Sequence, residues 1–223
     1  MKRLLAAVGG VFLLSAGELS AVAVSGTVEF VTKRGQRPVV NETVIWLEPA
    51  GAKTSRPSPE TAQIVTRSKT LFPHVLTVPA GSVVEFPNED PISHNLFSLS
   101  PGNSFDLGLY RKGAGKAQKF DTPGQVNVYC NVHPNMSAVI HVMPTPYYAF
   151  ADASGRFSID VPPGRYRLVA WNELGGTTES AVDVREGGVT GNVALTIDSR
   201  NFRLVQHKNK QGRPYRAPSS REY

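Results

Sequence analysis

Apolar and polar residues alternate along much of the chain, in short stretches separated by turn residues. In the clearest stretch, residues 125–130 (QVNVYC), every second position up to Cys130 is apolar, and the alternation resumes at residues 137–142 (SAVIHV). A period of two places successive side chains on opposite faces of a β-strand. No long stretch has the apolar stripe of an amphipathic helix. The pattern therefore predicts an all-β fold.

More short strands are predicted on both sides of this region. Residues 147–198 predict four of them, with a tight turn at residues 162–164 (PPG). Two further strands are expected far upstream, at residues 25–31 (SGTVEFV) and 42–49 (ETVIWLEP). A strand pair alone cannot bury its apolar face. These two strands must therefore pack onto another part of the chain.

Residues 1–23 have the features of a secretory signal peptide. Two basic residues precede an apolar run that is short for a membrane span. A small-x-small pattern follows at residues 21–23, which predicts cleavage before Val24. An uncleaved membrane anchor is the alternative. With cleavage, the mature protein is expected in the periplasm.

The net charge of +6 belongs to one end of the sequence. Residues 199–223 contain seven Lys and Arg against one Glu, whereas residues 24–198 are nearly neutral. The end segment has no apolar period, which predicts a basic disordered tail. It is either simply solvated or makes a weak contact with an acidic partner or an anionic membrane surface. An exported protein without a basic patch in its folded part is not expected to bind nucleic acid.

Cys130 is the only cysteine of the chain, so it cannot form an internal disulfide. It stands in the motif VYCNVHPNM, where His133 and Met136 follow at intervals of three. The motif lies in a tight loop between two predicted strands, and Pro134 restricts the backbone of that loop. Two donors three residues apart can reach one metal ion, and the thioether can approach from a third side.

A second histidine, His94, follows a predicted strand in the stretch NEDPISHNLFS. Two imidazoles, one thiolate and a weak thioether suit one copper ion that cycles between Cu(I) and Cu(II). The predicted ligand set is His94, Cys130, His133 and Met136. A buried unreactive cysteine and a zinc site are the alternatives, although methionine is a poor zinc ligand.

The other histidines are not expected in this set. His141 falls on the opposite face of its strand from Met136. His74 is interpreted as a surface or turn residue, and His207 has no partner in the tail. The neighbouring carboxylates Glu89 and Asp90 are interpreted as turn caps. No nucleotide-binding loop or nucleophile motif occurs, so the chain is not expected to be an enzyme.

Residues 62–144 resemble a cupredoxin of the plastocyanin and azurin superfamily, on FPHVLTVPAGSVVEFPNEDPISHNLFS, SFDLGLY and GQVNVYCNVHPNMSAVIHV. The short Cys-x2-His-x2-Met loop is similar to that of amicyanin. The resemblance implies a Greek-key β-sandwich over residues 58–144, with copper near one end. It implies strong ligands at His94, Cys130 and His133, a weak axial ligand at Met136, and a role for Asn95 in fastening the two ligand loops by hydrogen bonding. His133 would be the ligand nearest the surface.

Residues 146–198 resemble a carboxypeptidase regulatory-like, transthyretin-like β-sandwich, on the segment ASGRF followed by PPGRY. Such a sandwich normally begins with two strands like those in residues 24–50. We therefore expect the cupredoxin sandwich to be inserted into this second, smaller sandwich. The alternative is that the two upstream strands join the cupredoxin sheet.

These features predict a periplasmic type 1 (blue) copper protein that transfers one electron between redox partners. A periplasmic redox protein such as a cytochrome or a dehydrogenase is the expected partner. The alternative is a binding module that holds or delivers copper, with the second sandwich as a scaffold. A third reading is a structural domain that leaves its thiol unused.

Overall fold

The computed structural model describes residues 21–51, 57–186, 190–203 and 205–215. Apart from one short 3-10 turn, Val40–Glu42, its regular elements are all β-strands, and this confirms the predicted all-β class. Within the described residues, no helix has the length and apolar character that a membrane span requires. Most of the predicted signal peptide and the last eight residues lie outside the described part.

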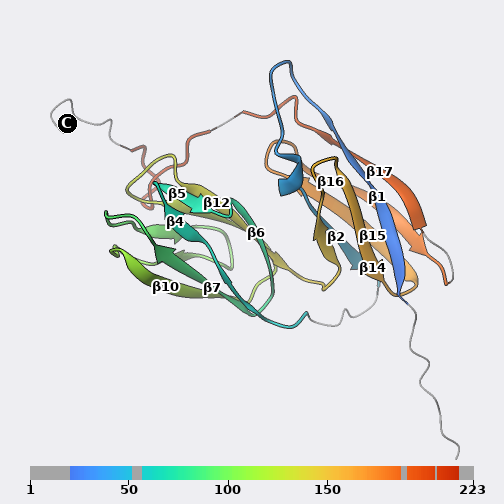
Figure 1. Cartoon of the computed structure of the whole chain (residues 1–223), viewed down its shortest axis with the longest axis horizontal. Coiled ribbons are helices and arrows are strands. Elements are labelled where there is room, and N and C mark those ends of the chain that lie inside the picture. Colours follow the sequence, from blue (N-terminus) through green and yellow to red (C-terminus); the bar gives the residue numbers. More distant parts are fainter. Residues whose placement is uncertain (1–20, 52–56, 187–189, 204, 216–223) are drawn as a thin grey trace, which may run out of the picture.

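The strands form two sandwiches, which lie on the two sides of Figure 1. We call the first the outer sandwich. One of its sheets has the order β14 (Arg156–Val161), β1 (Val22–Val31), β17 (Thr190–Asp198). The other has the order β13 (Tyr148–Phe150), β2 (Val44–Pro49), β15 (Gly164–Asn172), β16 (Gly176–Val184).

We call the second the inner sandwich. One sheet has the order β10 (Gly113–Phe120), β7 (Ser82–Asn88), β4 (Val65–Arg67), β5 (Thr70–Phe72), and β3 (Thr61–Gln63) also pairs with β7. The other has the order β6 (Val75–Pro79), β12 (Ser137–Met143), β11 (Gly124–Cys130), β8 (Leu96–Ser98), β9 (Phe105–Asp106).

Each sandwich has its own apolar core. Phe86, Val128 and Ile140 are fully buried between the inner sheets. Leu47 and Leu168 are fully buried in the outer core, together with side chains from the first and last strands. Burial of one such side chain contributes about 1.5–3 kcal/mol, so each sandwich is stabilised largely by its own strands.

The two upstream strands belong to the outer sandwich. β1 pairs with β14 and in parallel with β17, and β2 lies between β13 and β15. The alternative, in which these strands extend the inner sheets, is not observed among the described pairings. The inner sandwich therefore lies between two segments that together form the outer one.

The two ends of the inner sandwich meet at one turn. The amide of Glu60 donates to the Ser82 hydroxyl, at 2.9 Å. The amide of Ala80 donates to the carbonyl of Met143, at 3.2 Å. The chain therefore enters and leaves the inner sandwich at neighbouring points.

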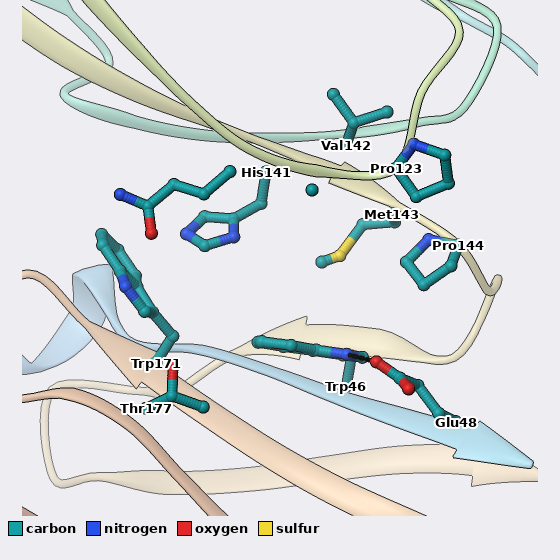
Figure 2. Close-up of a pocket in the computed structure, with 11 residues that line it drawn as sticks. Trp46, Glu48, Pro123, His141, Val142, Met143, Pro144, Trp171 and Thr177 are labelled. Atoms are coloured by element: carbon teal, nitrogen blue, oxygen red, sulfur yellow. Dashed lines mark hydrogen bonds between the residues drawn. The ribbon is translucent and has the colours of Figure 1, made fainter. Parts of the chain in front are cut away.

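A small apolar cluster joins the sandwiches. Met143 of β12 packs with Trp171 of β15, and Trp46 of β2 packs against the same cluster. Figure 2 shows these side chains facing one another across the junction. An ion pair between His74 and Glu173, at 2.8 Å, adds a polar contact beside the cluster.

The expectation of a disordered basic tail is wrong for the part that the structure describes. Residues 205–215, which we call the C-terminal segment, run along the inner sandwich (Figure 1). Lys210 and Tyr215 form specific hydrogen bonds with that sandwich. Basic composition correctly indicated the lack of strands here, but it carries no information about single contacts of this kind.

Candidate metal centre

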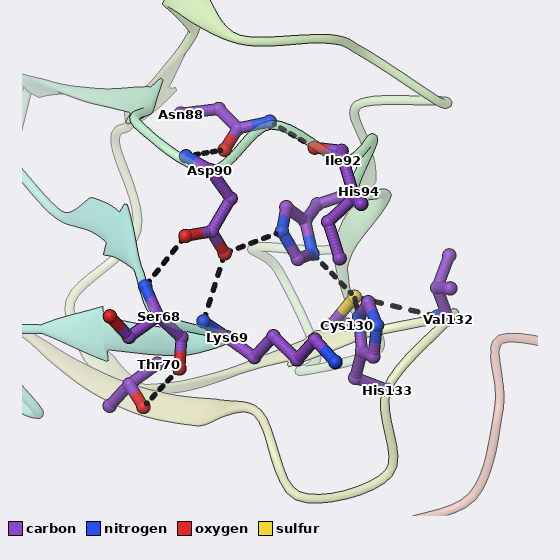
Figure 3. Close-up of polar contacts among 10 residues, drawn as sticks. All are labelled: Ser68, Lys69, Thr70, Asn88, Asp90, Ile92, His94, Cys130, Val132 and His133. Atoms are coloured by element: carbon purple, nitrogen blue, oxygen red, sulfur yellow. Dashed lines mark hydrogen bonds and ion pairs between the residues drawn. The ribbon is translucent and has the colours of Figure 1, made fainter. Parts of the chain in front are cut away.

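Three donor side chains meet at one end of the inner sandwich (Figure 3). The Nδ1 atoms of His94 and His133 lie 3.8 and 3.7 Å from Sγ of Cys130, and the three ligand atoms all lie within 4.8 Å of one another. His94 and Cys130 are fully buried, whereas His133 is partly exposed. The structure thus brings together three of the four predicted ligands around one point.

The strand register explains how residues distant in sequence meet. Cys130 ends β11 and pairs with Leu96 at the start of β8, which places His94 two residues away from that pair. A backbone bridge between His94 and Tyr110 fixes the loop before β8. The pleat turns Cys130 inward with the other buried residues of β11, as the alternation predicted.

The ligand loop itself is tight. The Cys130 amide donates to the carbonyl of Met136, at 3.1 Å, and the Met136 amide donates to the carbonyl of His133, at 3.3 Å. Met136 is buried in the same core cluster as Cys130. This places Met136 beside the three-donor cluster through its main chain.

Asp90 orients the imidazole of His94. Its Oδ2 lies 3.0 Å from Nε2, so this nitrogen donates its proton to the carboxylate and Nδ1 turns its lone pair toward Cys130. The sequence suggested only that Asp90 caps a turn. Its position four residues before His94 was the available signal, but only the folded turn shows that the two side chains face each other.

Two backbone amides hold the carboxylate of Asp90 in place. Its carboxylate accepts the amides of Ser68 and Lys69, at 2.6 and 2.8 Å, from the turn between β4 and β5 (Figure 3). Burial opposes ionisation of this carboxyl group, but these two amides and His94 outweigh it and lower its pKa. A charged Asp90 therefore supports His94 near neutral pH.

The sulfur and the second imidazole have their own environment. The Val132 amide donates to Sγ of Cys130, at 3.4 Å, which helps to fix the position of the sulfur. Burial lowers the pKa of His133, and the nearby His94 lowers it further. His133 is therefore neutral near pH 7, the form that can bind a metal.

Asn95 fastens the two ligand loops through its main chain. Its carbonyl accepts the amide of Asn131, at 2.8 Å. Its side chain, however, donates to Asp106, at 2.6 Å, and not to the loop that carries Cys130. The predicted fastening of the loops is therefore made by the backbone of Asn95, while its side-chain amide anchors Asp106.

The C-terminal segment reaches this network. Lys210 forms an ion pair with Asp106, at 2.6 Å, and its amide donates to the side chain of Asn131, at 3.0 Å. The contact with Lys210, together with Asn95 and the amide of Gly108, lowers the pKa of Asp106 to about 2. The segment therefore contacts Asn131 in the loop that follows Cys130 and the Asp106 carboxylate to which Asn95 donates.

Two aromatic residues of the segment lie next to the cysteine. The hydroxyl of Tyr215 donates to the carbonyl of Cys130, at 2.6 Å. His207 stacks on Tyr129, with ring centroids 4.3 Å apart and planes at 16°, and contacts Tyr215 edge-on. The prediction that His207 has no partner is therefore wrong.

The remaining histidines lie outside the three-donor cluster. His74 bonds to Ser137 and Glu173. His141 lies on the opposite face of β12, as predicted from its parity, and lines a cavity between the sandwiches.

The donor set fits a soft or borderline transition metal. Two imidazole nitrogens and one thiolate are ligands that copper and zinc accept. The hydrogen bonds to Asp90 and from Val132 fix both the ring of His94 and the sulfur of Cys130. The site is therefore organised to receive a metal ion.

Comparison with known proteins gives matches only among solved structures. No family model matches the chain, and no curated protein matches it. A purple cupredoxin from Nitrosopumilus maritimus is 26% identical, with 37% of this chain and 99% of that one covered and a TM-score of 0.33. A reduced mutant of amicyanin is 18% identical, with 36% and 80% covered and a TM-score of 0.34.

A copper-containing nitrite reductase from Thermus scotoductus SA-01 is also similar. It is 24% identical, with 52% of this chain and 28% of that one covered and a TM-score of 0.35. The proteins found thus include an enzyme as well as small cupredoxins.

Proposed function

We propose that this chain is a mononuclear type 1 copper protein that carries single electrons between redox partners. The observation that carries the proposal is the convergence of His94, Cys130 and His133, with their ligand atoms within 4.8 Å of one another. Copper held there would supply a one-electron couple between Cu(I) and Cu(II). Two imidazoles and one thiolate are the strong donors of such a site.

The way the donors are held favours electron transfer. Asp90 fixes the ring of His94, and the Val132 amide bonds to the sulfur of Cys130. Ligands that are held by the protein change position little between two oxidation states, so the barrier to electron transfer stays low. We propose Met136 as the weak axial donor, since it is buried beside Cys130.

We further propose that His133 is the point where electrons enter or leave. It is the partly exposed ligand, and its neighbour Val132 is 46% exposed. The exposed apolar side chain of Val132 next to this ligand suits brief contact with a redox protein, such as a cytochrome or a dehydrogenase. The periplasmic location proposed for the mature chain would provide such partners.

The test is a visible absorption and EPR spectrum of the mature chain from Val24 after addition of one equivalent of Cu(II). We expect an intense thiolate-to-copper band that ascorbate bleaches and oxidation restores. A colourless protein would overturn the type 1 assignment.

The same sample separates the carrier from a protein that delivers copper. A Cu(I) chelator is added to the reduced form, and the released copper is followed over time. A carrier keeps its copper and regains the band on oxidation. Rapid release of Cu(I) would instead favour the delivery function.

A further inference from the structure

A second cluster of metal-binding side chain types lies at the junction of the sandwiches. A cavity of about 430 Å³ opens there between β12 on one side and β2 and β15 on the other (Figure 2). We call it the junction cavity. Its lining includes His141, Met143, Trp46 and Trp171.

His141 and Met143 share one face of β12 because they are two residues apart. This face is opposite to the one that packs into the inner core. Figure 2 shows both side chains projecting into the cavity. His141 is only 5% exposed and Met143 only 2%, so both side chains are buried in the wall of the cavity.

The imidazole of His141 is not engaged in the way that His94 is. Its Nε2 has no hydrogen-bond partner among the described residues. Its ring meets the indole of Trp171 edge-to-face, with centroids 4.3 Å apart and planes at 63°. Burial lowers the pKa of His141 to about 4. At neutral pH the ring is therefore neutral and has a lone pair free to bind an ion.

The other side chains that line the junction cavity favour a soft metal ion. Met143 offers a thioether sulfur, and Trp46 and Trp171 offer aromatic faces that attract a cation. The one carboxylate in the lining, Glu48, is already bonded to the indole nitrogen of Trp46 and to Arg167. Hard ions such as Mg²⁺ and Ca²⁺ need several oxygen ligands. A thioether favours soft ions such as Cu(I), and imidazole accepts copper as well.

We propose that the junction cavity binds one Cu(I) ion through an imidazole nitrogen of His141 and the thioether sulfur of Met143. Trp46 and Trp171 would shield the ion from water. This second site goes beyond the proposed electron transfer and does not depend on it. Ligands of the two sites come from opposite faces of the same sheet, so each site can fill separately.

The chain contains its own reporter for this site. Its only two tryptophans are Trp46 and Trp171, and both line the junction cavity. Tryptophan fluorescence therefore reports this cavity, and not the cluster around Cys130. The probe is Ag(I), a soft ion like Cu(I) that is not oxidised under these conditions.

The experiment titrates the metal-free mature chain with Ag(I) and follows fluorescence together with native mass spectrometry. We expect two bound ions, one at each site, and a change in fluorescence that accompanies only one of them. Cys130→Ser should remove one ion and keep the fluorescence response.

Two variants test the cavity itself. Met143→Leu keeps the volume of the side chain, and His141→Gln removes the imidazole. Each should weaken the binding that fluorescence reports by about tenfold or more, while the ion at Cys130 remains. Thr177→Val, in the same lining, is the matched control and should bind as the unchanged chain does.

Two results would overturn the proposal. One is a single bound ion that disappears in Cys130→Ser, with no fluorescence response. The other is an undiminished response in both Met143→Leu and His141→Gln, with circular dichroism showing that both are folded. A missing copper band with an intact fluorescence response would count against the proposed electron transfer alone.

Discussion

His94 and His141 are both buried in the inner sandwich, but their imidazole rings have opposite surroundings. At the ligand end, the carboxylate of Asp90 fixes the ring of His94 and aims Nδ1 at Cys130. At the junction cavity, Nε2 of His141 has no hydrogen-bond partner among the described residues, and burial lowers the pKa of that ring to about 4. A charged partner therefore fixes the direction of the His94 ring, whereas burial without such a partner leaves the His141 ring neutral with its nitrogen unpaired.

Removal of the thiolate is expected to have the largest effect. Cys130→Ser should abolish the intense visible band completely, because the band arises from a bond between sulfur and copper. Met143→Leu should leave the band intact, because its sulfur lies at the other region. Visible spectra of both variants at equal copper content provide the check. A blue Cys130→Ser variant would show that the site is assigned to the wrong residues.

Lowering the pH should reduce the free energy of unfolding, because His141 is buried as the neutral ring. The pKa of this ring is about 4 in the folded chain against 6.5 in an exposed histidine. As the pH falls from 6.5 toward 4, the unfolded chain takes up a proton that the folded chain does not, so stability is lost. The shift corresponds to about 3 kcal/mol.

Urea unfolding of the metal-free chain at pH 7 and pH 4 measures this loss. His141→Gln should lose less stability than the unchanged chain over the same interval, since Gln does not titrate. Equal losses in the two proteins would mean that the folded chain accepts the proton on His141.

Asp90→Asn should leave the ring of His94, like that of His141, without a charged partner. The variant keeps an acceptor but loses the negative charge and one of the oxygens that hold the turn at Ser68 and Lys69. We expect copper affinity to fall about 10–100-fold, measured by competition with a chelator.

The exposed pair of Asp121 with Lys119 provides the matched control. Asp121→Asn removes the same charge far from any described donor of the cluster and should leave affinity unchanged. If both variants bind copper as tightly as the unchanged chain, Asp90 does not position His94.

A substitution in the C-terminal segment is expected to have the smallest effect. Tyr215→Phe removes the hydroxyl that donates to the carbonyl of Cys130. Loss of one such bond should reduce the free energy of unfolding by about 1 kcal/mol. The visible band should keep its position, because the bond ends on the main chain and not on the sulfur. Unchanged stability would indicate that the segment does not dock in solution.

Most of the donor cluster was predictable because its residues are close together in sequence. Cys130, His133 and Met136 stand within seven residues, and the alternation of β11 and β12 showed which side chains face inward. His94 could be selected only because it follows a strand and has the correct chemistry. The strand register that brings it to Cys130 is a property of the whole sheet.

The supporting contacts were not predictable in the same way. Aspartate is common in ordinary turns, so the residue type of Asp90 gave no special signal. Its contact with His94 depends on the shape of the folded turn. Lys210 and Tyr215 belong to a segment whose average composition is that of a disordered chain. The junction cavity joins Trp46 to Trp171, which are distant in sequence, so no local pattern indicates it.

The meeting of both ends of the inner sandwich at one turn has a consequence for folding kinetics. Val24 pairs with Ile159, so the outer sandwich depends on contacts of very high sequence separation, which form slowly. If residues 61–143 fold first, Glu60 and Met143 are held beside the same turn. The two segments of the outer sandwich are then separated by a much shorter effective loop. Bringing them together therefore costs less conformational entropy. With that order of folding, the inner sandwich serves as a template for the strands that surround it in sequence.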